Sequence, residues 1–553
     1  MGVSDSVVPT VAEAILEYLL SRGIDTAFGV ISIHNIALYD AAARHPRFRI
    51  ISARSEQGAV NMATGWARAS GKLGVAITST GTGAGNAAGA LVEAWSGGTP
   101  LLHLTGQVAS AYLDRHWGYI HEAKDQLGML SAAGKAAWRL SDPEAIGGLL
   151  EEAYATAGQA PAGPVSIEIP VDLQSAPLRR SPRLSRLQVE GSPSRLDGLA
   201  EAVELLRNAR RPVLWVGGGA VAAGAFAEVA WLWEWLKAPL LTSQSGRGIV
   251  SEEHPLCLGY FGSYPEVAEL LAEADLLVSV GTRFRTNEAN PGRWPVPAAH
   301  LNIDADPRAA CRPVGASLGL VGDVRAVLQA IAEAVGDQKA SSEESWRERA
   351  RAVRTAVRQR LVDTLGPYAE IAAALAARLP EDAIVVRDVT VHTSSWASRL
   401  LPVRRPRTAI HAAGGGIGQG LAMAIGAQVA FPERPVVALV GDGGLLVDLG
   451  ELSVMGDLGL PIVVILFDDR GYGVLRNIQD REYAGRHIGV DWRRVDFPAI
   501  AQAMGIGVLT VEQAGEFAPA LARALSERRP WMIYVDTEKV GPMRVPFGGP
   551  PGR

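Results

Sequence analysis

Apolar and polar positions in the first third of the chain follow two periods in turn. Residues 10–23 repeat apolar side chains at helical spacing and end at Gly23, and residues 56–71 read as a second helix. Apolar runs between such segments predict short strands at 26–30, 48–54, 73–80 and 100–107. Strands alternating with helices favour a parallel sheet with helices on both faces.

The last third of the chain repeats a local plan of the first. In the first third, a strand meets the turn GTGAGN at 81–86, and a helix, Gly98-Thr99-Pro100 and another strand follow. In the last third, the strand 435–440 meets GDGG, and a helix from about Leu445, Gly459-Leu460-Pro461 and another strand follow. Two interpretations stay open, because all parallel α/β domains share this rhythm: coincidence, or two related domains that face each other.

The middle third predicts a further α/β domain. It begins near Arg211, where PVLWV runs into Gly217-Gly218-Gly219, and more strands follow at 238–242, 274–281 and 299–304. Polar segments at 175–195 and 343–361 are typical of domain boundaries. The sequence therefore predicts an α/β protein of three domains, each a mostly parallel sheet flanked by helices, at 1–178, 192–338 and 362–540.

Composition narrows the class of protein. The chain has 553 residues, of which 48% are hydrophobic and 20% charged, and its formal net charge is −5. Without a basic block, nucleic acid is not an expected partner, and no apolar run reaches the length of a membrane span. Cys257 and Cys311 match no metal spacing, and the acidic residues near the N-terminus do not resemble a signal peptide. We expect a cytoplasmic protein.

Two acidic turns near residues 436–473 carry the clearest chemistry. One apolar run ends at Gly441-Asp442-Gly443, and the next ends at Asp468-Asp469. Open parallel sheets bind ligands at the carboxyl ends of their strands, and a helix start favours an anion there. Because Asp442 would repel a bare phosphate, a divalent cation resolves the conflict. Mg²⁺ needs about six oxygens, which Asp442, Asp469, a carbonyl near Gly471, two diphosphate oxygens and a water would supply.

This stretch resembles the diphosphate-binding motif of thiamine-diphosphate enzymes, in which GDG is followed about two dozen residues later by Asn. The resemblance implies Mg²⁺ held by Asp442, Asp469 and Gly471, with diphosphate contacts extending to Gly443, Gly444 and Tyr472. Here Asp468-Asp469 stands where the family usually has Asn. The departure adds negative charge at the metal but leaves the number of ligands unchanged.

A second resemblance, to the acetolactate synthase group, lies in ISARSEQGAVNMATGWARASG. It implies that Glu56 activates the cofactor by hydrogen-bonding a ring nitrogen of the pyrimidine. Taken alone, Glu56 would be an ordinary acidic residue at a helix start. HAAGGGIGQG resembles the segment that supports the bent cofactor, which assigns Ile417 as the support and the Gly415 carbonyl as an acceptor. RDVTVHTSSW falls where the family contacts the diphosphate and thiazolium, with Thr390 and His392 as candidates.

The resemblance spans about Thr10 to Asp536 and implies pyrimidine-binding, central and diphosphate-binding domains in that order. It also implies a cofactor held between two subunits, and hence a homodimer or homotetramer. The expected substrate is a small 2-oxo acid, an aldehyde or a 2-hydroxy ketone. The expected reaction is decarboxylation, or the joining or splitting of a carbon–carbon bond next to a carbonyl.

Three further residues bear on which member of the family this is. His34 stands where some carboligases and lyases, including benzaldehyde lyase, carry an active-site histidine, and His121 where the family often has glutamine. Gln107 matches a pocket residue of acetolactate synthases. Each histidine has an ordinary structural alternative in a loop.

Other positions depart from acetolactate synthase. Ile478 stands where that group has a tryptophan, and GYFGSYP and TRFRTNE differ from its flavin-contacting stretches, so FAD is doubtful. Three readings stay open: decarboxylase or carboligase, benzaldehyde lyase-like enzyme, and, from another class, a dinucleotide-dependent oxidoreductase using the glycines at 217–219. A silent binding paralogue is disfavoured, because Glu56, Asp442 and Asp469 are all present.

Overall fold

A computed structural model describes residues 8–179, 196–285, 288, 294–308, 314–336 and 342–549 of the chain. It contains three six-stranded sheets, and every strand pairing within them is parallel. The predicted α/β class is therefore confirmed. The sheets fall inside the predicted ranges 1–178, 192–338 and 362–540.

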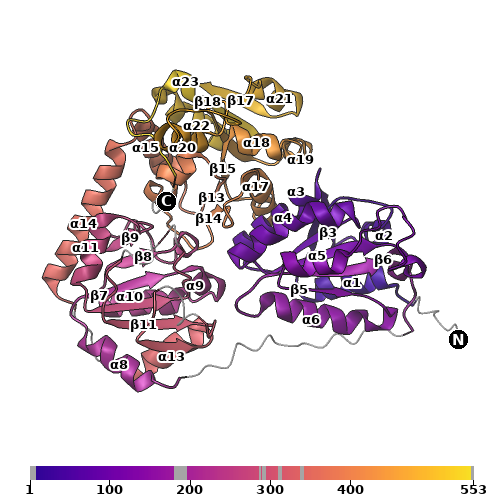
Figure 1. Ribbon diagram of the computed structural model, residues 1–553, viewed down its shortest axis with the longest axis horizontal. Helices are drawn as coiled ribbons and strands as arrows, with labels where there is room; N and C mark the ends of the chain where they lie inside the picture. Colours follow the sequence, from indigo (N-terminus) through magenta and orange to yellow (C-terminus); the bar gives the residue numbers. More distant parts are fainter. Residues whose placement is uncertain are drawn as a thin grey trace. The chain divides into compact units, whose positions relative to one another are not determined.

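The first sheet has the strand order β2-β1-β3-β4-β6-β5. Its strands are β1 (Thr26–Gly29), β2 (Arg49–Ser52), β3 (Gly74–Thr78), β4 (Leu101–Gln107), β5 (Ala136–Arg139) and β6 (Pro164–Pro170). The helices between them are α1 (Val11–Ser21), α2 (Ile36–Ala43), α3 (Glu56–Ser70), α4 (Thr82–Gly97), α5 (Gln126–Ala133), α6 (Ile146–Gly158) and α7 (Val171–Gln174). In Figure 1, α1 and α6 lie on one side of this sheet and α3 and α4 on the other.

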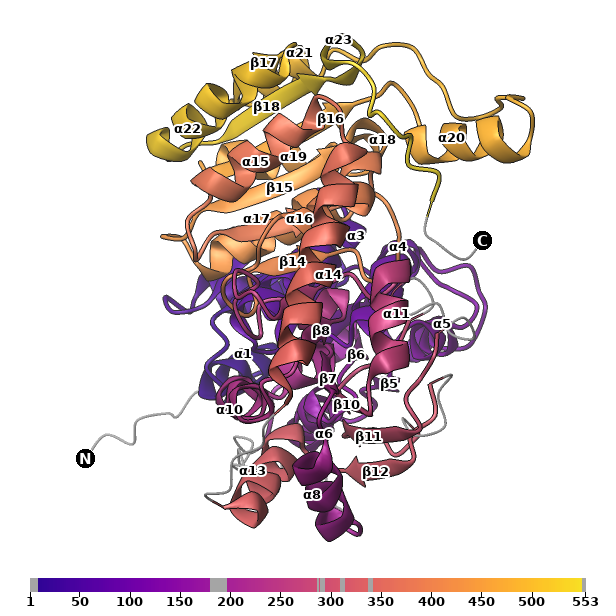
Figure 2. The ribbon, with the colours of Figure 1, turned by 90° about the vertical axis from the view of Figure 1, so that its left-hand side faces the viewer.

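The second sheet has the order β12-β11-β10-β7-β8-β9. Its strands are β7 (Pro212–Val216), β8 (Leu240–Thr242), β9 (Cys257–Gly259), β10 (Leu276–Val280), β11 (Ala299–Asp304) and β12 (Leu318–Val321). Its helices are α8 (Leu199–Asn208), α9 (Gly218–Ala222), α10 (Phe226–Leu236), α11 (Pro265–Glu273), α13 (Val324–Val335) and α14 (Glu344–Asp363). The polar segment 343–361 is thus a helix, which buries Trp346, Val353 and Val357 and runs beside α11 (Figure 2).

The third sheet has the order β14-β13-β15-β16-β18-β17. Its strands are β13 (Ile384–Arg387), β14 (Ala409–His411), β15 (Val436–Gly441), β16 (Ile462–Asp468), β17 (Gly507–Val511) and β18 (Trp531–Asp536). The helices are α15 (Tyr368–Arg378), α16 (Ser398–Leu400), α17 (Gly420–Ala430), α18 (Asp442–Val447), α19 (Glu451–Asp457), α20 (Gly473–Glu482), α21 (Phe497–Ala503), α22 (Phe517–Glu527) and α23 (Thr537–Val540). The helix after GDG begins at Asp442, earlier than the predicted Leu445.

The first and third sheets share one strand order, and the second does not. Numbered within each sheet, the first and third both read 2-1-3-4-6-5, whereas the second reads 6-5-4-1-2-3. Of the two interpretations of the repeated plan, this shared topology supports related domains, since mere alternation of strands and helices would not fix the order.

Contacts divide the chain into two compact units. The first unit comprises Met1–Glu190 together with Ala412–Glu433 and Asp448–Leu460, and the second comprises the remaining segments. In the first unit, α17 packs closely on α3, because a Cβ at Gly65 would lie 2.0 Å from the Met423 carbonyl oxygen and one at Gly426 only 1.9 Å from that of Met62. Glycines at both crossing points therefore let the two helix backbones approach.

Candidate active site

The two acidic turns of the second unit meet at the carboxyl ends of β15 and β16, which are neighbours in the sheet. Asp442 is 1% exposed, and its carboxyl is hydrogen-bonded to that of Asp469. The Gly471 N–H donates to Asp442 Oδ2 at 2.9 Å. The structure thus brings together the three residues that the sequence assigned to the metal.

The two carboxyls cannot both carry a charge in this buried setting. Burial, and next the neighbouring Asp469, raise the pKa of Asp442 far above its ordinary range, and burial also raises the pKa of Asp469. A pair of close buried carboxyls shares a proton unless a cation compensates both charges. A divalent cation would remove this conflict, and hard oxygen donors are what Mg²⁺ prefers.

The two adjacent aspartates, Asp468 and Asp469, have different partners. Asp468 Oδ2 accepts from the Tyr534 hydroxyl at 2.6 Å, and its Oδ1 accepts from the Arg470 N–H at 3.1 Å. Asp469 instead turns to Asp442. Of these two aspartates, only Asp469 therefore adds its carboxylate to that of Asp442, since the Asp468 carboxylate bonds Tyr534 and Arg470.

Arg476 stands close to this extra charge. Its guanidinium donates to the Asp469 carbonyl at 3.2 and 3.3 Å and pairs with Asp491. Arg476 is also the main positive charge that lowers the pKa of Asp469 against the opposing effect of burial. This cation offsets part of the negative charge that the departure from Asn introduces.

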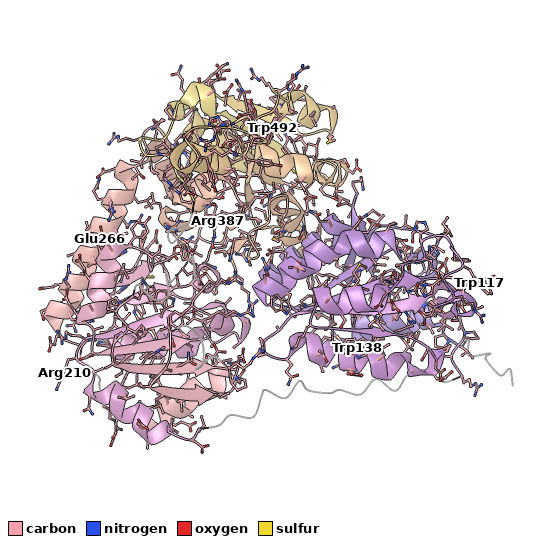
Figure 3. The ribbon with its side chains drawn as sticks, in the orientation of Figure 1. Trp117, Trp138, Arg210, Glu266, Arg387 and Trp492 are labelled. Carbon is pink, nitrogen blue, oxygen red and sulfur yellow. The ribbon has the colours of Figure 1, made fainter. Side chains whose placement is uncertain are left out.

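Small residues and rings shape the turn around Asp442. A Cβ at Gly441 would lie 3.1 Å from Cγ2 of Thr390, and one at Gly443 would lie 2.8 Å from the Tyr472 ring and 3.0 Å from that of Trp492, which Figure 3 labels. Gly444 is buried in the same helix start. Thr390 and Tyr472 thus border the acidic turn, as the resemblance implies.

His392 is enclosed by aromatic side chains. Its ring lies 4.3 Å from those of Tyr368 and Phe467, and its Nδ1 accepts from Trp396 Nε1 at 3.3 Å. Burial lowers the pKa of His392 to about 3, so the ring is neutral at physiological pH. This geometry favours packing, and Nε2 is the ring atom left to meet a ligand.

Glu56 opens α3 in the first unit. Asn86 Nδ2 donates to Glu56 Oε2 at 3.1 Å, and a Cβ at Gly83 would lie 2.8 Å from Glu56 Oε1. Gly83 therefore leaves room for this carboxylate, and Asn86 orients it. The hydroxyl of Tyr39 lies nearby and is buried without a partner among the described residues. Its burial, and to a smaller extent the charge of Glu56, raise the pKa of Tyr39.

His34 and His121 come together although 87 positions separate them in the sequence. Their ring centroids lie 5.2 Å apart, edge to face. His34 is 2% exposed, and its Nδ1 is buried without a partner among the described residues. Burial, and next the neighbouring His121, lower the pKa of His34.

The backbone of His121 is held against the turn that also touches Glu56. Its φ is +64°, in the left-handed region, and a Cβ at Gly81 would lie 2.0 Å from the His121 carbonyl oxygen. Such a backbone costs energy in a non-glycine residue and is frequent at functional sites. Glu56, His121 and, through His121, His34 thus gather around residues 81–83.

Gln107 lies in a buried polar network. Its Nε2 donates to Glu168 at 3.3 Å, and its Oε1 accepts from the Val108 N–H at 2.8 Å. Gln126 joins the same network, since its Nε2 donates to Glu168 at 3.1 Å and its Oε1 accepts from the Gly81 N–H at 2.6 Å. In this conformation the Gln107 amide braces the turn and the sheet.

The segment with Gly415 and Ile417 belongs to the first unit. Glu93, which pairs with Arg68, accepts from the N–H groups of Ala413 at 2.7 Å and Gly414 at 2.6 Å. Gly415 is exposed with φ +81°, and Ile417 is half-buried. Glu93 therefore fixes the start of the segment and leaves Gly415 and Ile417 open to a ligand.

Sequence reasoning missed several residues that hold the site in place. Asn86, which orients Glu56, lies within the quoted turn GTGAGN and could have been singled out there. Nothing in the sequence marks the others, because their partners are far along the chain: Gln126, Glu168, Glu93 and Tyr534.

Comparison with known proteins decides the family. The N-terminal TPP binding domain of thiamine pyrophosphate enzymes matches residues 9–129, the central domain of these enzymes matches 199–331, and their C-terminal TPP binding domain matches 388–535. A probable 2-ketoarginine decarboxylase of Pseudomonas aeruginosa is 34% identical, over 90% of this chain and 89% of its own length. The chain belongs to the thiamine pyrophosphate enzymes.

Two other relatives point to one branch of this family. The large subunit of acetolactate synthase isozyme 3 of Escherichia coli is 30% identical over 97% of both chains. A probable acetolactate synthase large subunit of Methanocaldococcus jannaschii is 29% identical over 97% of this chain and 94% of its own. The predicted acetolactate synthase-like, thiamine diphosphate-dependent family is thus confirmed.

The described residues supply some, but not all, of the oxygens that a metal would need. The proton-sharing pair Asp442 and Asp469 offers two oxygen donors to a cation. Within the described ranges, no cluster of three or more His, Cys, Asp and Glu side chains is arranged to hold a metal by itself. A cation at the pair would therefore need further oxygens from backbone, water or diphosphate.

No helix of the described residues could cross a membrane.

Proposed function

We propose that this thiamine diphosphate enzyme acts with Mg²⁺ on a small 2-oxo acid. It removes CO₂ and then releases an aldehyde or joins the remaining carbon to a second carbonyl compound. The observation that carries the proposal is the buried pair of carboxyls, Asp442 and Asp469, at two adjoining strand ends. Such a pair is costly without a cation. The names of the acetolactate synthases and the 2-ketoarginine decarboxylase above support the same reaction class.

Bound thiamine diphosphate supplies an electron sink for the carbon–carbon bond next to a carbonyl. Asp442 and Asp469 would hold Mg²⁺ together with the Gly471 backbone. Thr390, His392, Gly443, Gly444 and Tyr472 would border the diphosphate. Glu56, oriented by Asn86, would hold or move a proton at the pyrimidine ring, the Gly415 carbonyl would accept a hydrogen bond from the cofactor, and Ile417 would support it.

A benzaldehyde lyase-like reaction on 2-hydroxy ketones is the second candidate, and the pair of His34 and His121 favours it. Splitting such a ketone requires removal of a hydroxyl proton, for which a neutral imidazole is suited. Burial keeps His34 neutral, since its pKa is lowered. Gln107 would act indirectly, because its Oε1 accepts from the Thr80 hydroxyl at 3.3 Å, beside the Gly81 that lies against the His121 carbonyl.

The glycines at 217–219, on which the oxidoreductase alternative rests, have a structural explanation. A Cβ at Gly217 would lie 2.2 Å from the Gly281 carbonyl oxygen, and one at Gly219 would lie 2.9 Å from the same atom. These glycines are needed where two strand ends of the second sheet touch. They therefore require no dinucleotide.

The proposal includes a homodimer or homotetramer in the cytoplasm. In the first unit, Ile31 and Ile33 in one loop and Trp117 and Ile120 in another are 55 to 68% exposed. Apolar side chains gathered in surface loops are typical of an interface that another protein covers. A second copy of the chain is the occupant that the family resemblance implies.

Two experiments test the function. Isothermal titration of metal-free protein with thiamine diphosphate, with and without Mg²⁺ and beside NAD, should show tight, Mg²⁺-dependent binding of thiamine diphosphate alone. A panel of 2-oxo acids, aldehydes and 2-hydroxy ketones, with products identified by mass, then separates decarboxylase, carboligase and lyase. Binding of NAD without thiamine diphosphate would reject the proposal.

A further inference from the structure

Arg387, the last residue of β13, is a buried charge that has no acidic partner within the part of the chain that the structure describes. It is 3% exposed, and once the Gln244 amide is turned so that its oxygen faces Arg387, that oxygen accepts from Nη1 at 2.9 Å and from Nη2 at 3.1 Å. Among the described residues, no carboxylate forms an ion pair with this guanidinium. Burial, and next the neighbouring Arg247, lower the pKa of Arg387 to about 9, which leaves it charged at neutral pH.

The nearby carboxylates are engaged elsewhere. Glu252 holds Arg247 through two bonds of 2.7 and 2.6 Å. Glu288 is 4% exposed, accepts from the Gln244 N–H at 3.0 Å, and has Arg285 as the first charge that lowers its pKa against burial. Neither compensates Arg387 directly.

A second unpaired guanidinium adds to the excess of positive charge. Arg399 is 8% exposed and lies 4.9 Å from the ring centre of Tyr260. Its Nη1 donates to the carbonyls of Ser394 at 2.5 Å and Ser395 at 3.2 Å, and it forms no ion pair with a described carboxylate. Arg399 also lowers the pKa of Arg387, so the two positive charges repel each other.

An uncompensated buried charge is expensive, and proteins normally pair it. Two buried cations beside an already paired third therefore leave an excess of positive charge among the described side chains, which an anion would compensate. Arginine is the residue best suited to receive it, because its planar fork matches the oxygens of a carboxylate or phosphate.

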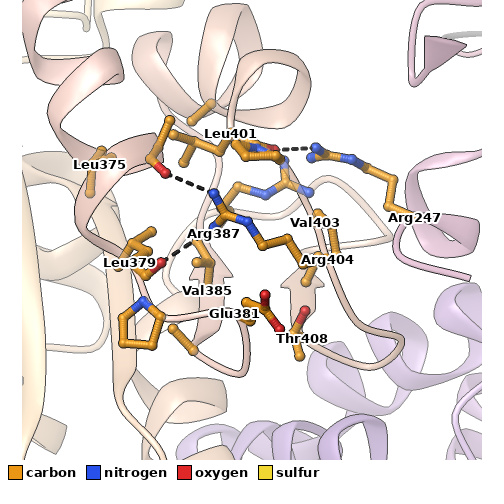
Figure 4. Close-up of a pocket in the computed structure, with 16 residues that line it drawn as sticks. Arg247, Leu375, Leu379, Glu381, Val385, Arg387, Leu401, Val403, Arg404 and Thr408 are labelled. Atoms are coloured by element: carbon orange, nitrogen blue, oxygen red, sulfur yellow. Dashed lines mark hydrogen bonds between the residues drawn. The ribbon is translucent and has the colours of Figure 1, made fainter. Parts of the chain in front are cut away.

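A pocket borders this charge. Arg247, Arg387, Arg404 and Thr408 contribute to its wall. Figure 4 shows the Arg387 and Arg247 side chains reaching toward each other at one end of it. Arg404 donates to Glu253 and to the carbonyls of Ala376 and Leu379 near the end of α15. Arg387 is therefore the arginine of this wall whose charge has no ion pair among the described residues.

We propose that Arg387, assisted by Arg247, binds a small oxyanion of the phosphate or carboxylate type in this pocket. All the residues involved belong to the second unit, and the inference does not depend on the substrate of the enzyme. The anion would stabilise the contact between the second and third sheets, since Arg247 and Gln244 follow β8 and Arg387 ends β13.

Thermal unfolding of the metal-free protein tests the proposal. Sodium phosphate or acetate is raised from 0 to about 50 mM, with ionic strength held constant by a bulky organic salt. We expect the melting temperature to rise by several degrees and to level off for at least one of the two anions. The same rise with ADP at tenfold lower concentration would also support the site and would show that the phosphate belongs to a nucleotide.

Variants separate this site from general salt effects. Arg387→Met should remove most of the anion-dependent rise, and Arg387→Lys should keep a weaker one. Arg405→Met is the matched control, because the Arg405 side chain is 59% exposed and pairs with the exposed carboxylate of Glu381. A melting temperature independent of both anions and of ADP, or an equal rise in wild type and Arg387→Met, would overturn the proposal.

A direct measurement on the unchanged protein covers the case in which Arg387→Met does not fold. Crystals soaked in selenate, an oxyanion that scatters anomalously, should show a selenium peak beside the Arg387 guanidinium. Selenium peaks confined to other sites would count against it.

Discussion

Two turns at equivalent places of the first and third sheets use one topology for different chemistry. Each follows the third strand in the shared order, β3 or β15, and each precedes a helix. At residues 80–83, Gln126 Oε1 accepts from both the Thr80 hydroxyl and the Gly81 N–H. At residues 441–444, a carboxyl comes instead from the turn itself, and Asp442 accepts from Gly471.

The difference lies in what each turn leaves unsatisfied. The first turn is neutral, and the glycines in it make room for neighbours, namely the His121 carbonyl at Gly81 and the Glu56 carboxylate at Gly83. The second turn places the Asp442 carboxyl beside that of Asp469, which follows the neighbouring strand β16, and the two cannot both ionise in this buried setting. The same fold thus presents protein groups suited to proton transfer at one turn and a cation-seeking pair at the other.

Removing the acid from the second turn should have the largest effect. Asp442→Ala is expected to weaken thiamine diphosphate binding at least 100-fold and to abolish turnover, since the cation loses a ligand at a buried site. Titration calorimetry with Mg²⁺ and thiamine diphosphate measures it. Asp480→Ala, at a half-exposed aspartate of the same unit, serves as the control. Unchanged binding by Asp442→Ala would sink the metal assignment.

Neutralising the acid beside the first turn should separate chemistry from binding. Glu56→Gln keeps the size and the contact with Asn86 but removes the acid–base function. We expect thiamine diphosphate to bind normally while kcat falls 100-fold or more, the scale of a lost acid–base step. Steady-state kinetics beside calorimetry tests this, and near-full activity would show that Glu56 only begins a helix.

A substitution at His34 tests whether the residues gathered around the first turn take part in proton transfer. His34→Ala should slow ligation or cleavage at least tenfold in single-turnover experiments, with cofactor binding intact. Because the pKa of His34 is lowered, the neutral imidazole persists somewhat below the ordinary histidine range. Wild-type activity that needs it should therefore hold at neutral pH and fall as pH drops through that lowered value.

The same shift makes a second, structural prediction for His34. A histidine whose pKa is lowered in the folded state contributes stability that is lost as pH falls below about 6.5, the ordinary value. His34→Ala should thus flatten the acid side of the stability profile, measured by chemical unfolding at several pH values. Identical rates and profiles for the variant and wild type would make His34 an ordinary loop residue.

Restoring the common family residue at Asp469, beside the second turn, should have the smallest effect. Asp469→Asn removes one charge and keeps an oxygen ligand, so activity should stay within about tenfold and Mg²⁺ should still bind. Asp468→Asn is the informative comparison, because Asp468 bonds Tyr534 and not the acidic pair. If Asp469→Asn loses the cofactor, Asp469 does more than supply an oxygen.

The local signals in the sequence determined the class of fold and the core of the site. Periodicity and glycine turns located four of the six strands of the first sheet and two of the six strands of the third, because side-chain period follows directly from strand and helix geometry. Asp442 and Asp469 were within reach for the same reason: adjacent parallel strands end at one edge, so residues that follow them are neighbours.

Only the tertiary structure decided which residues support and modify that site. The pairing of His34 with His121, the brace of Gln126 and Glu168, and the unpaired charge of Arg387 all depend on contacts between segments far apart in the chain. Sequence spacing carries no distance across such gaps, and whether a polar side chain is functional or structural depends on burial and partners. His392 illustrates this: one histidine in a motif became, in the fold, a neutral ring packed among Tyr368, Phe467 and Trp396.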